Sequence, residues 1–427
     1  MTNRYQKYLD SLMQPFKKLT KIEFLQPDGS VAFSIDNNFK RGYRTRYDTR
    51  AFIQGGTLSV SLQNGQRRRA TITLSNLDCA FDYAVNNIWF GQQVRLIMGL
   101  ELPDGTEFYL PQGVFYINNP SIAFKPNQRT ATYNLVDKWA YLDGTLFGTL
   151  NGTYQIAKNE GTNGSLWSAI KDTLKLDRQT FNTTTNELMQ IDNVSPVFTT
   201  FYDNKSGNDV RANIPYPIVV GGDNTTVANI LLELNGIIVG WIGYDQTGAL
   251  RVDASQNDVD DNNKPILWNF TPNNSQLLGI TETIKNSEVC NEVIIVGQNL
   301  NKTNIFGKVT NIDPRSDTNV NLIGRRTYKE SQPNYSNIQQ CIDLAKFRLK
   351  RKTILQKSVT VESTQMFHLV ENNLITVTRT DKNGSPTEKH LINSFTLPIG
   401  ETGQMAINCT SVNDLPNLIT EIETGTE

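Results

Sequence analysis

The chain has 427 residues, which is too long for one hydrophobic core and predicts about two to four domains. Hydrophobic residues make up 38% and charged residues 19%, so the composition supplies globular cores and excludes a disordered chain. The 41 Lys and Arg against 42 Asp and Glu give a formal net charge of −1, so the chain as a whole lacks the basic charge that is typical of a dedicated nucleic-acid binder.

The beginning of the chain carries no signal for export. Residues 1–21 are polar and lack the apolar segment of a signal peptide, and no apolar run approaches the roughly 18–20 residues of a membrane span. The cysteines lie far apart, without metal-ligand spacing, at Cys79, Cys290, Cys341 and Cys409. These features predict reduced, mostly buried thiols and a chain without a membrane anchor that is made in a cytoplasm.

The first 145 residues are dominated by strand patterns. Residues 3–19 form a predicted amphipathic helix, packed on its own domain or on a neighbour. The clearest hairpin has Asn64-Gly65 in its connection, flanked by apolar residues at every second position: Leu58, Val60, Leu62, Ala70, Ile72 and Leu74. Period-two alternation buries that set on one face. Further strands at 94–100, 113–117 and 130–135 predict a barrel or sandwich.

Residues 146–277 change to a mixed pattern. A helix is predicted after Ser165, and a second helix over 227–234 is capped by Thr225 or Thr226. A strand over 237–244, a turn and a strand over 250–253 follow, which makes a compact α+β unit. The acidic loop at 258–261 has carboxylates that suit a cation, but it lacks the EF-hand pattern.

The β pattern returns from about residue 278. Strands are predicted at 280–285, 292–297, 358–362, 374–379 and 390–396, with a polar loop over 298–318 and a helix over 338–350 capped by Ser336. Residues 406–427 are polar and acidic, as in a loose tail or a strap onto a partner. The predicted fold class is mainly β with an α+β middle region, divided at 1–145, 146–277, 278–405 and 406–427.

Signatures of catalysis are missing from the sequence. The two histidines, His368 and His390, lie in no HExxH or similar arrangement. The chain also lacks a GxSxG nucleophile context and a Walker A lysine loop. We therefore predict a non-enzymatic protein with no catalytic residue, no cofactor and no bound metal.

Basic residues gather in two places, and three interpretations of them remain open. Arg41, Arg44, Arg46 and Arg50 alternate with aromatic residues, and Arg67, Arg68 and Arg69 follow in the hairpin. Interleaved basic and aromatic residues suit nucleic-acid contact. A charged subunit interface or a plain solvated surface explains the same pattern, and we carry these seven arginines forward as a candidate interface.

Four segments together resemble the baseplate hub and tail-tip proteins of bacteriophages. The run GTLSVSLQNGQRRRATITLSN (56–76) resembles the opening hairpin of that family, and the GVFYI strand (113–117) is similar to its next hairpin. TATYNLVDKWAYLD (130–143) resembles a strand that ends in an aspartate-led helix. LAKFRLKRKTILQKSVTVES (344–363) resembles the helix that feeds a strand pair in the second hub barrel.

The resemblance implies two tail-tube-like β-barrel domains with a mixed insertion between them. It also implies a homotrimer around a channel, joining the sixfold tail tube protein to a central spike or tip protein. Contacts with other baseplate proteins or the tape measure, and DNA only in transit, would follow, as would a place in the virion tail. Two alternatives stay open: a distal tail or host-glycan-binding protein, with Trp139 or Trp241 in a shallow site, and a cell-wall-degrading enzyme. We expect both tryptophans in cores.

Overall fold

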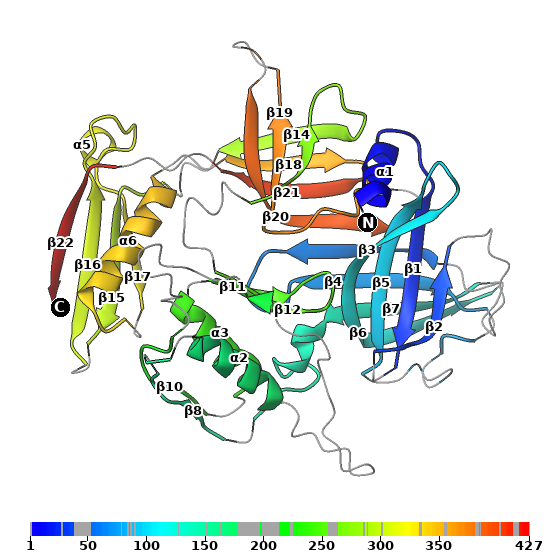
Figure 1. Cartoon of the computed structure of the whole chain (residues 1–427), viewed down its shortest axis with the longest axis horizontal. Coiled ribbons are helices and arrows are strands. Elements are labelled where there is room, and N and C mark those ends of the chain that lie inside the picture. The colour runs from blue at the N-terminus through cyan, green and yellow to red at the C-terminus, as the bar shows by residue number, and fades with distance from the viewer. Residues whose placement is uncertain are drawn as a thin grey trace.

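The computed structural model describes most of the chain between residues 2 and 426. The residues outside the description are 1, 27–28, 38–52, 78, 83–84, 86–87, 89–90, 127, 151, 160, 163, 177–196, 199–212, 223–224, 239, 255–263, 285–286, 288, 300–301, 333–334, 354–356, 381–383, 385, 401–402, 413–417 and 427. The described part is mainly β, as predicted, with a mixed middle region (Figure 1).

One 13-stranded sheet organises most of the molecule (Figure 1). Its order is β14-β18-β21-β20-β3-β4-β7-β6-β5-β1-β2, with β19 pairing with β20 and β13 with β19. The first part of the chain supplies β1 (Lys18–Leu25), β2 (Val31–Asp36), β3 (Ile53–Ser61), β4 (Arg68–Ser75), β5 (Gln93–Glu101), β6 (Glu107–Lys125) and β7 (Gln128–Asp137). The last part supplies β13 (Ile266–Phe270), β14 (Leu277–Ile284), β18 (Lys357–Ser363), β19 (Leu374–Thr378), β20 (Thr387–Ile399) and β21 (Met405–Ser411).

Alternation along the strands decides which face of this sheet is buried. Val60 and Ile72 are each 1% exposed, whereas Ser59 and Thr71 lie on the opposite face. Because side chains of a strand point alternately to its two faces, the apolar set meets in one core. Phe395 and Leu397 of β20 join the same core. The predicted faces of the first hairpin are confirmed.

The two outer β regions of the chain share this sheet through one strand pair. β20 runs antiparallel to β3, with Phe395 opposite Val60 and Leu397 opposite Leu58. A single apolar cluster therefore extends across both regions. The family resemblance implied a separate barrel in each region, whereas the observed sheet runs through both regions as one hydrogen-bonded structure. The predicted boundaries at 145, 277 and 405 stay predictions.

The middle region forms its own small α+β unit beneath the large sheet (Figure 1). Helices α2 (Ser165–Leu176) and α3 (Val227–Ile238) pack against a three-stranded sheet of β9 (Val197–Phe198), β11 (Gly240–Tyr244) and β12 (Leu250–Ala254). β8 (Tyr154–Ile156) pairs with β10 (Ile218–Val220). The helix predicted over 227–234 begins where expected, and the Thr226 hydroxyl accepts a hydrogen bond from the Asn229 backbone N–H.

A four-stranded sheet lies apart from the large sheet and is covered by helix α6 (Ile338–Lys352) (Figure 1). It contains β17 (Thr327–Ser331), β15 (Glu292–Gln298), β16 (Asn304–Asn311) and β22 (Thr420–Thr426) in that order, with short helix α5 (Val320–Ile323) beside it. Two predictions are wrong here. The supposed polar loop over 298–318 contains β16, and the supposed tail over 406–427 contributes strands β21 and β22. Asn337, rather than Ser336, caps α6 through a capping box with Gln340.

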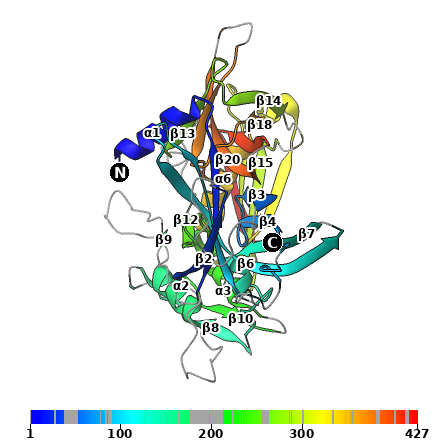
Figure 2. The same cartoon turned by 90° about the vertical axis from the view of Figure 1, so that its right-hand side faces the viewer.

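Helix α1 (Thr2–Leu12) packs on its own chain between the two halves of the large sheet (Figures 1 and 2). Tyr8 is fully buried and Leu12 is 1% exposed. The helix is shorter than predicted: it ends before Pro15, which restricts the residue before it, and β1 begins at Lys18. Apolar spacing alone does not separate the end of a helix from an apolar strand that follows closely.

No disulfide joins the four cysteines, all of which are described: Cys341 and Cys409 are buried, Cys290 is partly buried and Cys79 is exposed. Within the described residues, no helix has the length and apolar character needed to cross a membrane.

Candidate functional site

The turn between β3 and β4 holds the large sheet against the middle region. The side-chain oxygen of Asn64 accepts a hydrogen bond from the Ile242 backbone N–H at 2.9 Å, and the Gly65 N–H donates to the Ile242 carbonyl at 2.9 Å. The turn thus continues the hydrogen bonding of β11. Asn-Gly is suited to such a turn because both residues tolerate positive φ, and Gly65 has a φ of 93°.

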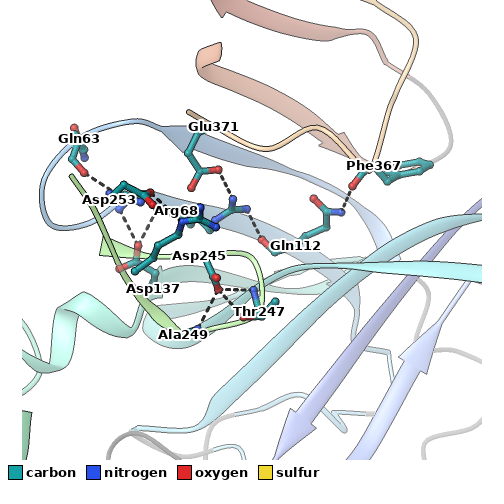
Figure 3. Close-up of polar contacts among 12 residues, drawn as sticks. Gln63, Arg68, Gln112, Asp137, Asp245, Thr247, Ala249, Asp253, Phe367 and Glu371 are labelled. Carbon is teal, nitrogen blue, oxygen red and sulfur yellow. Dashed lines mark hydrogen bonds and ion pairs between the residues drawn. The ribbon is translucent and has the colours of Figure 1, made fainter. Parts of the chain in front are cut away.

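Arg68, directly after this turn, ties the two halves of the large sheet together (Figure 3). Its side chain is 1% exposed, and Nη2 lies 2.5 Å from Oε2 of Glu371, whose side chain is 3% exposed. Nη1 donates to the Gln112 carbonyl at 2.9 Å, and the Gln112 side chain donates to the Phe367 carbonyl at 2.8 Å. A buried cation is tolerated only when it is paired and hydrogen-bonded, as here.

Asp137 fixes the backbone that presents these arginines. One carboxylate oxygen accepts from the N–H groups of Arg67 and Arg68 at 2.8 and 2.9 Å, and the other accepts from Trp139 N–H at 3.1 Å, where Asp137 caps the short helix η2 (Lys138–Tyr141). Burial raises the pKa of Asp137 to about 6, although the three N–H donors act in the opposite direction. One carboxylate therefore orients three backbone groups.

Arg67, the residue directly before β4, faces the middle region. Its Nε donates to the Gln63 carbonyl at 3.1 Å. Burial lowers the pKa of Arg67, while the carboxylates of Glu371 and Asp253 act to raise it. β11 approaches so closely that a Cβ at Gly243 would lie 2.5 Å from the Arg67 Nε. Only glycine fits at position 243, because the Arg67 side chain already fills the space that a Cβ would need.

Further polar contacts lie in the middle region, on the side that faces Arg67 (Figure 3). The Asp245 carboxylate accepts from the N–H groups of Thr247 and Ala249 in the β11–β12 turn, at 2.8 and 3.1 Å. Arg251 binds Asp253 at 2.7 Å. All three sections of the chain thus meet within a few residues of Arg68. We call Arg67, Arg68, Gln112, Asp137 and Glu371 the buried junction.

The candidate arginines divide between the interior and the surface. Arg67 and Arg68 have partners inside the chain, whereas Arg69 is exposed and donates from Nε to the Gln66 side chain at 2.7 Å. Arg41, Arg44, Arg46 and Arg50 lie outside the described residues. An interface role stays a prediction for the set, and the internal partners of Arg67 and Arg68 favour a role within the subunit for those two.

His368 forms a second buried polar cluster, at α1. Its Nδ1 lies 3.1 Å from the Tyr8 hydroxyl, and its Nε2 lies 3.2 Å from the Leu267 carbonyl. The Tyr8 hydroxyl accepts the Phe367 N–H at 3.0 Å. The Leu267 carbonyl can only accept, so Nε2 carries a proton. Burial lowers the pKa of His368 to about 4, which favours the neutral ring, and Nδ1 of that ring accepts from the Tyr8 hydroxyl. The arrangement fastens α1 to the sheet.

Other candidate sites have no supporting geometry in the described part of the chain. No group of three or more His, Cys, Asp or Glu side chains is positioned to hold a metal ion among those residues. The acidic loop at 258–261 lies outside the description. Trp139 is 3% exposed in the middle-region core, as expected, whereas Trp241 is only partly buried.

In β3, β4, β7, β14, β18, β20 and β21, the side of the large sheet opposite the core carries mostly hydroxyl and amide side chains, and we call this part the hydroxyl-rich face. On β1 and β5 the same side of the sheet carries ion pairs of Lys21 and Arg95 with Glu23. Cross-strand partners place one set on it: Thr57, Ser59, Ser61, Arg69, Thr71, Thr73, Thr130, Thr132, Asn134, Thr281, Thr283, Thr360, Glu362, Ser394, Thr396 and Asn408. Several of them are linked across strands, as in Thr360 to Asn408 at 2.9 Å and Asn408 to Ser394 at 3.1 Å. Arg69 and Glu362 are the charged members of this set.

Solved structures share this architecture along almost the whole chain. The prophage MuSo2 43 kDa tail protein from Shewanella oneidensis has a TM-score of 0.55 at 13% identity, covering 93% of this chain and 98% of that one. The tail protein from Neisseria meningitidis MC58 has a TM-score of 0.57 at 10% identity, covering 94% and 99%. The lidded Francisella PdpA-VgrG complex has a TM-score of 0.50 at 10% identity, covering 98% of this chain and 57% of that one.

No protein-family model matches the sequence, and no curated protein matches it. The similarity of this chain to known proteins therefore lies in its fold. The chain has the fold of phage tail proteins, and the resemblance drawn from its sequence is confirmed at that level.

Glu371 and Gln112 belong to the buried junction but were not among the residues predicted from the sequence. A lone glutamate in a loop carries no signal of its own. The available signal was the unusual Arg67-Arg68-Arg69 run, since strand alternation places Arg68 on the same face as Ala70 and Ile72. A cation on an apolar face predicts a buried counter-ion somewhere in the chain.

Proposed function

We propose that this chain is a structural subunit of a phage tail baseplate and acts as its hub. The observation that carries the proposal is the fold shared with prophage and bacterial tail proteins over more than nine tenths of both chains. The place of the protein would be the virion tail, after synthesis in the host cytoplasm. We infer that it has no enzymatic activity of its own.

Three copies would form the hub ring. The two β regions of each subunit, taken as tail-tube-like units, would then present six similar elements to the tail tube protein. The opposite side of the ring would receive the central spike or tip protein, and other baseplate proteins or the tape measure would bind at its rim. The buried junction supports this role because it fixes the two β regions rigidly within one subunit.

The hydroxyl-rich face would line the central channel. Lys and Arg contacts to phosphates supply most of the non-specific affinity for DNA, and clustered carboxylates repel it. A wall of Thr, Ser and Asn side chains with few charges does neither, so DNA passes without binding. That property suits a protein that meets DNA only in transit.

The mass of the purified chain in solution tests the ring. Light scattering over a range of concentrations should give three times the subunit mass of 48.1 kDa. A mass of six subunits would favour a distal tail ring, and a monomer at every concentration would contradict the hub assignment. Negative-stain images of the trimer should show a ring with a central opening.

A further inference from the structure

The hairpin of β6 and β7 extends beyond the rest of the large sheet. β5 pairs with β6 only as far as Tyr116, whereas β6 continues to pair with β7 as far as Lys125. We call the described residues 118–126 and 128–132 the arm, and Figure 2 shows it projecting from the body of the molecule. In the described structure, the arm portion of β6 has β7 as its only strand partner, so its other edge presents unpaired backbone groups.

The arm continues the two faces of the sheet but lacks a core of its own. Ile122 and Phe124 lie on the apolar face, opposite Ala131 and Arg129. Phe124 is 75% exposed and Ile122 is 38% exposed. Two neighbouring apolar side chains on one face of an exposed edge strand are unusual in a monomer, because such edges promote association.

The terminal strand β14 has a pattern that matches the arm. Among the described residues β14 pairs with β18 alone, so one edge is open. Thr281 and Thr283 lie on the hydroxyl-rich face, and Ile280 lies on the apolar face. The Glu362 carboxylate covers Gly279, reaching within 3.2 Å of the position that a Cβ would occupy there.

We propose that the arm of one copy adds as an antiparallel strand to β14 of the next copy. This inference rests on the proposed ring and specifies its subunit contact. Lys125 would lie opposite Gly279, within reach of the Glu362 carboxylate, while Phe124 covers Ile280 and Ala123 faces Thr281. Both apolar rows then lie on one side of the joined sheet, and the hydroxyl-rich faces become continuous from copy to copy.

The symmetry of this contact fits a closed ring. The arm and β14 are different surfaces of one sheet: β14 is a terminal strand, and the arm is the part of β6 and β7 that runs past the end of β5. The contact is therefore head to tail, and a head-to-tail contact closes into a ring when its rotation permits. Strand addition supplies the main-chain hydrogen bonds, and alternate side chains supply specificity. The binding partner of the arm is therefore a second copy of this chain.

Charge reversal tests the contact in solution. Lys125→Glu and Glu362→Lys should each lower the scattering mass from three subunits toward one at concentrations where the wild type is trimeric. The double variant should restore the trimer, because the pair is re-formed with opposite polarity. Phe124→Asp should also give monomers, whereas the matched control Leu322→Asp, at a residue 69% exposed on α5, should leave the trimer intact.

A cysteine pair tests the register. Ala123→Cys combined with Thr281→Cys should form covalent dimers and trimers under oxidised glutathione, and each single variant should not. A trimeric wild type with intact Phe124→Asp trimers and no cross-link would overturn this inference and leave the hub proposal standing. A wild type that stays monomeric at every concentration would overturn both.

Discussion

The Arg68–Glu371 pair provides the sharpest test of how the two β regions are joined. Arg68→Met keeps an unbranched apolar side chain and removes the guanidinium group with its charge. The Glu371 carboxylate, 3% exposed, then loses its partner at 2.5 Å, and the Gln112 carbonyl loses a donor. Removing one member of a buried pair costs roughly 3–5 kcal/mol, because an uncompensated charge stays buried.

Urea unfolding followed by far-ultraviolet circular dichroism measures this loss through the midpoint and slope of the transition. Arg69→Met is the matched control: the same chemical change at the next residue, on the exposed face, should alter the free energy of unfolding by about 0.5 kcal/mol or less. Adding Glu371→Met to Arg68→Met should recover much of the loss, since a buried pair replaced by apolar groups is often neutral. Equal effects of Arg68→Met and Arg69→Met would refute the reasoning.

Three further predictions concern the core, the glycine contact and acid stability. Val60→Asp and Ile72→Asp should each lower the free energy of unfolding by several kcal/mol or abolish soluble expression. The control Ser59→Asp, on the open face, should be tolerated. A soluble, folded Val60→Asp variant would contradict the assigned strand face. Gly243→Ala should loosen the middle region by forcing Arg67 aside, which would appear as faster proteolysis there, while Gly236→Ala in α3, with nothing near its added methyl group, should stabilise by about 0.5–1 kcal/mol. Because the pKa of His368 is lowered to about 4 in the folded chain, the unfolded chain binds more protons between pH 6.5 and 4, and stability should fall by up to about 3 kcal/mol across that window; His368→Gln should flatten the profile. Asp137 acts in the opposite direction, since its pKa is raised to about 6, so Asp137→Asn should steepen the acid loss, and an unchanged slope in both variants would count against these assignments.

The arginine run shows where reasoning from the sequence reached its limit. Three consecutive arginines in a strand were interpreted together, as one basic surface. Alternation sends Arg68 to one face and Arg69 to the other, and this much follows from the sequence because the period of a strand is two. Glu371, the partner of Arg68, is 303 residues away in the chain. No local pattern indicates such a pairing, because it depends on how two distant regions pack together.

The sequence by itself determined the local elements and their faces. Apolar alternation predicted β3, β4 and their buried sides, and the capping residue and apolar stripe of α3 predicted its start, because both signals depend on residues that are neighbours in the chain. Only the tertiary structure decided that β3 and β20 pair, that residues 420–426 complete a distant sheet, and that Arg68 meets Glu371. The physical reason is that strand pairing is satisfied by backbone groups common to every residue, so the choice of partner depends on which apolar faces can be buried together.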